Sequence, residues 1–163
     1  MRYTIAPARE GHFLSLHRAT DTVAREKKFL AFTQAPPLEQ SIAFYRGLQR
    51  AGAPHFVALD GASVVGWVDV APQVGESRAH IGTLGIALLP AVRHKGIGSR
   101  LMQAAIDQSW AKGLTRIELT VRTDNAKAKA LYERFGFKQE GILRRSCLIE
   151  NQYHDMYFMA LLR

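Results

Sequence analysis

The chain has 163 residues, a hydrophobic fraction of 47%, a formal net charge of +8 and an isoelectric point near 10. This length fits one domain, residues 1–163, with a hydrophobic core of its own. The sequence shows no apolar run of the ~20 residues that span a membrane, no signal-peptide pattern and no cysteine besides Cys147, so we expect a cytoplasmic protein without membrane or disulfide.

Hydrophobic periodicity predicts elements in the order β, α, α, β, β, β, α, β, α, β, β. The first six are a strand at 3–5, helices at 9–19 and 38–51, and strands at 55–59, 64–70 and 80–88. Asp60-Gly61 between two apolar runs is typical of a hairpin turn.

The second half continues with a helix at 97–112, a strand at 115–121, a short helix, and strands at 138–150 and 152–162. Thr123, Asp124 or Asn125 can cap the start of the short helix. Gly136 suits the position just after its end, because that position often takes a left-handed conformation.

A basic loop with two glycines joins the strand at 80–88 to the helix at 97–112. It reads Arg93-His94-Lys95-Gly96-Ile97-Gly98-Ser99. The start of a helix carries unpaired N–H groups and partial positive charge, and glycines leave room for a ligand to approach them. The segment therefore predicts a pyrophosphate site, with an ordinary glycine-containing helix start as the alternative.

The short helix carries a second pattern. Asn125 and Tyr132 are seven residues apart, which is about two helical turns, so they lie near the same face. Ala128 between them leaves room for a ligand.

Together, Arg93-x-x-Gly96-x-Gly98 and Asn125-x-x-Ala128-x-x-Leu131-Tyr132-x-x-x-Gly136-Phe137 resemble the GNAT superfamily of acetyl-CoA-dependent N-acetyltransferases. The resemblance covers essentially the whole chain, and the C-terminal half is similar to bacterial amino-acid and phosphinothricin-type N-acetyltransferases. It implies an α/β (α+β) fold with a mixed, mostly antiparallel sheet of about seven strands and about four flanking helices. It implies acetyl-CoA as co-substrate and no metal, and it is compatible with a homodimer.

The resemblance also implies roles for individual residues. The backbone of Ile86, Ala87 and Leu88 would pair with the arm of the cofactor, and Asn125 would contact that arm. The pyrophosphate would be held by Arg93, His94, Lys95, Gly96, Ile97, Gly98 and Ser99. The alternatives are a plain core strand, a helix cap and a helix start.

Tyr132 matches the family position that donates a proton to the CoA sulfur, with an ordinary packed tyrosine as the alternative. A phenol with a pKa of ~10 is a weaker acid than a thiol near 8.5. A hydrogen bond to the departing sulfur is therefore expected to be the larger part of its role.

The general base is left open by the sequence. The strand at 80–88 contains no Asp or Glu, so Glu76, His80 and Glu118 are the candidates, with a water relay as the alternative. Residues 25–35 and 153–157 are expected to line or cover the amine pocket. Phe29, Phe32, Tyr153 and Tyr157 are candidates for its apolar wall, with ordinary core packing as the favoured alternative for each.

The basic charge has three interpretations: a solvated surface, attraction of the polyanionic cofactor, or nucleic-acid binding. The basic residues are scattered and no nucleic-acid motif accompanies them, so we expect no nucleic-acid partner. The leading interpretation is direct acetyl transfer in a ternary complex to a small primary amine, most simply the α-amine of an amino acid. The alternatives are a protein N-terminal or lysine acetyltransferase and a binding module without turnover.

Overall fold

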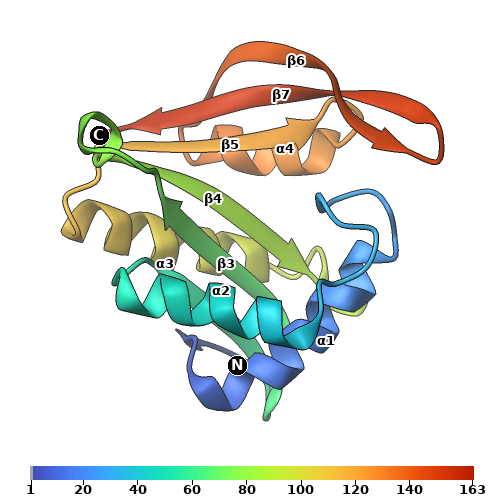
Figure 1. Cartoon of the computed structure of the whole chain (residues 1–163), viewed down its shortest axis with the longest axis vertical. Coiled ribbons are helices and arrows are strands. Elements are labelled where there is room, and N and C mark those ends of the chain that lie inside the picture. The colour runs from blue at the N-terminus through green and yellow to red at the C-terminus, as the bar shows by residue number, and fades with distance from the viewer. Residues whose placement is uncertain (1) are drawn as a thin grey trace.

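The computed structural model describes residues 2–163 and shows a seven-stranded sheet with helices on both faces (Figure 1). The strands are β1 (Tyr3–Pro7), β2 (His55–Asp60), β3 (Ser63–Pro72), β4 (Ile81–Leu88), β5 (Arg116–Arg122), β6 (Lys138–Ile149) and β7 (Gln152–Leu162). The α-helices are α1 (Phe13–Ala24), α2 (Leu38–Arg50), α3 (Ile97–Ala111) and α4 (Ala126–Arg134), with 3-10 turns at Glu10–His12, Glu76–Arg78 and Pro90–Val92. The predicted order of helices and strands is confirmed.

The strand order in the sheet is β1-β2-β3-β4-β5-β7-β6. All neighbours are antiparallel except β4 and β5, which confirms a mixed, mostly antiparallel sheet. The parallel pairing covers only Ile81, Gly82 and Thr83 of β4. Beyond Thr83 the two strands diverge, and Figure 1 shows them as the arms of a V.

Two hydrophobic cores lie on opposite faces of the sheet, as the alternation of side chains along a strand requires. On the face covered by α3 and α4, here the α3 face, Leu101 and Met102 pack against Val68. On the face covered by α1 and α2, here the α1 face, Leu16 and Trp67 pack together. Alternate side chains of β3 and β4 therefore point into the two cores in turn.

The first helix differs from the prediction. It was expected at 9–19, but residues 10–12 form a 3-10 turn and α1 runs on to Ala24. The hydroxyls of Thr20 and Thr22 bond the carbonyls of Leu16 and Arg18, four residues back, so the threonines stay within the helix. Burial of Val23 in the α1-face core stabilises this last turn.

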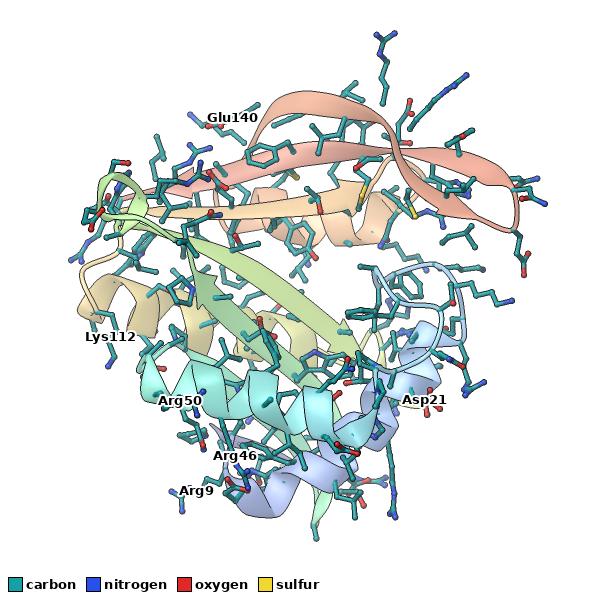
Figure 2. The ribbon with its side chains drawn as sticks, viewed as in Figure 1. Arg9, Asp21, Arg46, Arg50, Lys112 and Glu140 are labelled. Carbon is teal, nitrogen blue, oxygen red and sulfur yellow. The ribbon has the colours of Figure 1, made fainter. Side chains whose placement is uncertain are left out.

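The predicted turns are confirmed. Gly61 has φ 60° in the β2–β3 turn, and Gly136 has φ 94° after α4. Glu150 and Asn151, with φ 51° and 61°, form the two-residue β6–β7 turn. Within residues 2–163 no helix is long and apolar enough to cross a membrane. Figure 2 shows the labelled basic side chains Arg46, Arg50 and Lys112 spread over the outside of α2 and the end of α3.

Candidate active site

The edge of β4 that faces β5 has no strand partner after Thr83 within the described residues. The N–H of Leu89 donates to Val65 O at 2.8 Å, and the N–H of Gln73 donates to Ile81 O at 3.1 Å. Because such antiparallel bonds recur at every second residue, odd-numbered residues of β4 bond to β3 and even-numbered ones point toward β5. The open part of the V, beyond Thr83, is therefore lined on the β4 side by backbone N–H and C=O groups without a strand partner.

The backbone groups of the three predicted cofactor-binding residues of β4 point in different directions. Ile86 directs both its N–H and its C=O into the opening. Leu88 does the same, although its C=O accepts a bond from Arg93 Nε at 3.0 Å. Ala87 turns its peptide groups toward β3, so it can line the opening but cannot pair there.

The start of α3 lies beside this open edge. Gly96 is the N-cap with φ 79°, and no side chain caps the helix. A Cβ on Gly98 would lie 3.5 Å from Leu131 of α4 and 3.7 Å from Leu88 of β4, so the three elements converge here. A Cβ on Gly96 would meet no atom of the chain within 4 Å. The N–H groups of the first turn, Ile97 and Ser99 included, can bind an anion.

The three basic residues of the loop are not equivalent. Arg93 donates to both oxygens of Glu26, at 2.9 and 2.6 Å, and its guanidinium stacks on Phe29 at 4.7 Å. Its side chain therefore holds the segment after α1. His94 and Lys95 are exposed beside Gly96, which leaves them as the side-chain donors nearest in sequence to the helix start.

Asn125 and Tyr132 are brought together on α4 as the sequence predicts. The Asn125 side chain accepts a bond from the N–H of Ala128 at 3.3 Å, so it caps the helix, while its amide N–H group can still donate to a ligand. Tyr132 is 7% exposed and packs in the α3-face core, with its ring 6.0 Å from Phe137. Burial raises the pKa of the Tyr132 phenol to about 12, which keeps its proton in place and favours a hydrogen-bond donor.

Two of the predicted bases lie at the closed end of the V. Glu76 and His80 are exposed in the β3–β4 connection, next to the point where β4 first pairs with β5. The carbonyl of His80 accepts from the N–H of Thr115 at 3.0 Å, which adds to this closure. Neither side chain faces the open part of the β4 edge.

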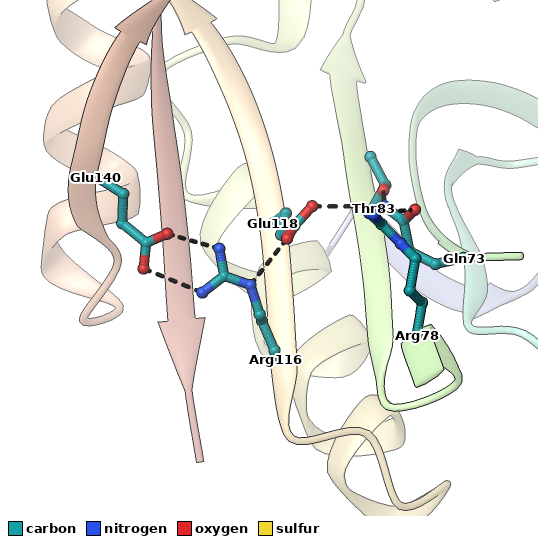
Figure 3. Close-up of polar contacts among 6 residues, drawn as sticks. All are labelled: Gln73, Arg78, Thr83, Arg116, Glu118 and Glu140. Carbon is teal, nitrogen blue, oxygen red and sulfur yellow. Dashed lines mark hydrogen bonds and ion pairs between the residues drawn. The ribbon is translucent and has the colours of Figure 1, made fainter. Parts of the chain in front are cut away.

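The third predicted base, Glu118, is buried but already partnered (Figure 3). One of its oxygens accepts from Arg116 Nε at 2.8 Å and the other from Gln73 Nε2 at 3.4 Å. Arg116 also binds both oxygens of Glu140, at 3.0 and 2.6 Å. Both oxygens of Glu118 therefore already accept hydrogen bonds from the chain.

Sequence reasoning missed Asp69 on β3. Asp69 is the register partner of Gly85, and a Cβ on Gly85 would lie 3.8 and 3.9 Å from its two carboxylate oxygens. The residue is only partly exposed, and burial raises the pKa of its carboxyl to about 7. The available signal was one acid within an otherwise apolar strand, Val64 to Val70.

The ionisable side chains nearest to Asp69 on the α1 face are His55 and Tyr45, and both are neutral at pH 7. His55, the partner of Asp69 in β2, is 6% exposed, and neither ring nitrogen has a hydrogen-bond partner among residues 2–163. Burial lowers the pKa of His55 to about 4, so the ring is neutral at pH 7. The Tyr45 ring of α2 lies 5.6 Å from His55, and burial raises the pKa of Tyr45.

Residues 25–37 bridge the two arms of the V. Lys27 Nζ pairs with Glu150 Oε1 at 2.8 Å at the β6–β7 turn, and Arg122 of β5 donates to Lys27 O at 3.4 Å. A cavity of about 230 Å³ lies between this segment and the β6–β7 hairpin, lined by Glu26, Lys27, Lys28, Arg122, Ile149, Glu150, Gln152 and His154. The segment therefore joins the two arms of the V, and its place as a cover over the amine pocket stays a prediction.

The predicted apolar wall is only partly assembled. Phe29 and Phe32 of the bridging segment are 41% and 52% exposed, and Tyr153 is 56% exposed. Tyr157 pairs with Val121 and packs in the α3-face core, where Lys129 Nζ lies 5.1 Å from its ring centroid. The packing of Tyr157 matches the alternative of a core residue rather than a wall residue of the amine pocket. No group of three or more His, Cys, Asp or Glu side chains in residues 2–163 is placed to hold a metal.

The amino-acid sequence matches a known family and known proteins. The model of the acetyltransferase (GNAT) family matches residues 19–137. The L-amino acid N-acetyltransferase AaaT of Escherichia coli K12 is 34% identical over 113 residues, 68% of this chain and 69% of that protein. The bS18-alanine N-acetyltransferase of Salmonella typhimurium LT2 is 36% identical over 76 residues, 47% of this chain and 51% of that protein.

Solved structures share the fold over nearly the full length. A phosphinothricin acetyltransferase from Sinorhizobium meliloti, solved in complex with AcCoA, superposes with a TM-score of 0.91 at 20% identity. The match covers 99% of this chain and 89% of that one.

Proposed function

The chain belongs to the GNAT family of N-acetyltransferases, and we propose that it acetylates the α-amine of a free amino acid, or a close analogue, by direct attack on acetyl-CoA. The observation that carries this choice of amine is the similarity to the E. coli L-amino acid N-acetyltransferase, 34% identical over 113 residues. The geometry of the V supports the choice of acyl donor.

Acetyl-CoA fits the features of the cleft. Its pyrophosphate matches the uncapped start of α3, where Gly96 opens to solvent and the first N–H groups lack partners in the helix. Its pantetheine arm, which carries amide groups, matches the free N–H and C=O of Ile86. Asn125 and Tyr132 then approach the arm and the sulfur from α4.

The protonation of the amine favours an α-amine. Only a neutral amine attacks a thioester. A lysine side chain with a pKa of ~10.4 costs about 4.6 kcal/mol to deprotonate at pH 7, whereas the α-ammonium of a free amino acid is more acidic by about one pKa unit and costs about 3 kcal/mol. We therefore expect α-amines to react faster than lysine side chains near pH 7.

The cover over the entrance favours a small acceptor. The segment 25–37 is tied to the cofactor loop through Glu26–Arg93 and to the β6–β7 turn through Lys27–Glu150. A polypeptide acceptor would have to displace this cover, whereas a free amino acid would not. The second candidate is acetylation of a protein N-terminus, which the 36% identity to the bS18-alanine N-acetyltransferase supports.

The experiment is thiol release from acetyl-CoA with each of the twenty amino acids and with peptides that begin with the best of them. Mass spectrometry of the product identifies the acetylated nitrogen. We expect N-acetyl amino acids, with peptides slower by tenfold or more. Faster turnover of peptides would instead favour acetylation of a protein N-terminus. No turnover with any amine would reject both candidates.

A further inference from the structure

The carboxylate of Asp69 reaches the strand that borders the opening. In the β3–β4 ladder Asp69 stands opposite Gly85, and the next residue, Ile86, points its peptide groups into the V. A Cβ at Gly85 would lie in van der Waals contact with the carboxylate, 3.8 and 3.9 Å from its two oxygens. The Asp69 carboxylate therefore lies directly over Gly85 of β4.

This carboxylate is without a partner in the described chain. Burial raises the pKa of the Asp69 carboxyl, and no hydrogen bond or charge contributes to that shift. The Glu118 carboxylate, by comparison, accepts a hydrogen bond from Arg116. Asp69 is partly exposed, and its oxygens are not among the fully buried side-chain atoms of residues 2–163 that lack a hydrogen-bond partner. An unpaired, partly exposed carboxylate can accept a proton from a ligand.

The side chains around Asp69 on the α1 face carry no charge at pH 7. β2 contributes neutral His55, α2 contributes Tyr45, and β4 contributes Gly85. From α1, the buried residues Phe13, Leu16 and Val23 carry no charge. No guanidinium or ammonium in residues 2–163 stabilises its ionised form.

Asp69 and Tyr132 lie on opposite faces of the sheet. Asp69 shares its face with Trp67, which packs in the α1-face core, whereas Tyr132 packs in the α3-face core. The open edge of β4 lies between them. An amine that enters on the α1 side would meet Asp69, and a thiolate that leaves on the α3 side would meet Tyr132.

Resting on the proposed function, we propose that Asp69 is the general base that deprotonates the acceptor ammonium. The carboxylate takes one proton from the ammonium nitrogen, breaking N–H and forming O–H, and the freed lone pair forms the new N–C bond. The C–S bond breaks with its electron pair on sulfur, and the Tyr132 hydroxyl donates a hydrogen bond to the departing thiolate. The second proton of the nitrogen passes through solvent to the thiolate, which leaves as CoA thiol, and Asp69 releases its proton to solvent.

The test compares Asp69→Asn with wild type over pH 6 to 9.5, using the best amine and acetyl-CoA. We expect kcat to fall by about 10²- to 10⁴-fold at pH 7.5, the range for loss of a general base. The loss should shrink toward pH 9.5, where solvent deprotonates the amine. In wild type, kcat/KM should show an acidic limb near pH 7 that the variant lacks.

Glu118→Gln is the matched control, since it removes the other buried acid and should keep the acidic limb. The thermal shift with CoA shows that each variant is folded and binds the cofactor. Wild-type kcat in Asp69→Asn, or an acidic limb that survives there, would overturn the role of Asp69 and leave the proposed function intact. Loss of the limb in Glu118→Gln with its retention in Asp69→Asn would assign the base to Glu118. Absence of wild-type turnover would instead reject the proposed function.

Discussion

Arg93 and Glu26 form a two-point ion pair, with Nη1–Oε1 at 2.9 Å and Nη2–Oε2 at 2.6 Å. Arg93 belongs to the loop before α3, where the cofactor is proposed to bind, and Glu26 begins the segment that is proposed to cover the amine entrance. The pair therefore links the two halves of the site. Its side chains are only 23% and 25% exposed, so solvent screens it less than an ordinary surface pair.

Replacing Glu26 with Gln should loosen the cover over the amine. A pair of this exposure contributes about 1 kcal/mol, so we expect the KM for the amine to rise about fivefold. The control is Glu10→Gln, which breaks the similar but more exposed pair with Arg46, at 53% and 57% exposure, on the far side of α2. Steady-state kinetics with equal amine KM values in both variants would contradict the link.

Gly96→Ala should separate backbone strain from ligand contact. At φ 79° an alanine is strained by about 1 kcal/mol, although its Cβ meets no atom of the chain. Gly61→Ala is the control, because Gly61 has φ 60° and an equally open Cβ position. Both variants should lose similar stability, but only Gly96→Ala should lose the rise in Tm that CoA produces. An unchanged CoA shift in Gly96→Ala would place the phosphate site elsewhere.

Tyr132→Phe should lower kcat by about ten- to a thousand-fold, the range for loss of one transition-state donor or acid. Stability should change little, since the ring stays in the core and burial alone accounts for the raised pKa of the hydroxyl. Tyr3→Phe in β1 is the control, and it should keep full activity. Turnover at the wild-type rate in Tyr132→Phe would remove the phenol from the reaction.

His55 and Asp69 should make opposite contributions to the pH dependence of stability. The pKa of His55 falls from 6.5 to about 4 on folding, so its contribution is lost as pH falls from about 6.5 to 4, by about 3 kcal/mol. The pKa of Asp69 rises from 3.8 to about 7, so its contribution is lost as pH rises from about 4 to 7, by about 4 kcal/mol.

Urea unfolding between pH 4 and 7.5 can separate these contributions. Relative to wild type, His55→Phe should gain stability as pH falls, and Asp69→Asn should gain stability as pH rises. Comparison with wild type cancels the common loss from exposed carboxylates such as Glu10 and Asp60, whose pKa values are lowered by Arg46 and Arg2. Stability differences that do not vary with pH would show that neither group is shifted.

The sequence predicts most of the fold because its signals are local. Alternation at period two locates the strands, and Asp60-Gly61 and Gly136 mark positions where φ is positive. The two motifs locate the start of α3 and the cap of α4 for the same reason, since capping depends on neighbours within one turn. Only α1 was misplaced, because burial of Val23 and Ala24 outweighs the low helix propensity of the threonines.

The remainder of the site depends on contacts that no local pattern encodes. The partner of Arg93 lies 67 residues away in the chain, so the sequence suggested a phosphate ligand where the structure has an ion pair. Asp69 is a single acid in an apolar strand, and only the register shows that it lies over Gly85. The choice between Ile86 and Ala87 as backbone ligands likewise required knowing which residues bond to β3.

The central claim, acetylation of the α-amine of a free amino acid, is tested most directly with two isomers of acetyl-lysine. Nε-acetyl-lysine offers only an α-amine, and Nα-acetyl-lysine offers only the side-chain amine, while both keep a free carboxylate. The α-ammonium is the more acidic of the two by about one pKa unit, and the α-amine is the one the site is proposed to hold, so kcat/KM should favour Nε-acetyl-lysine by about tenfold or more. Equal or faster turnover of Nα-acetyl-lysine would contradict the account.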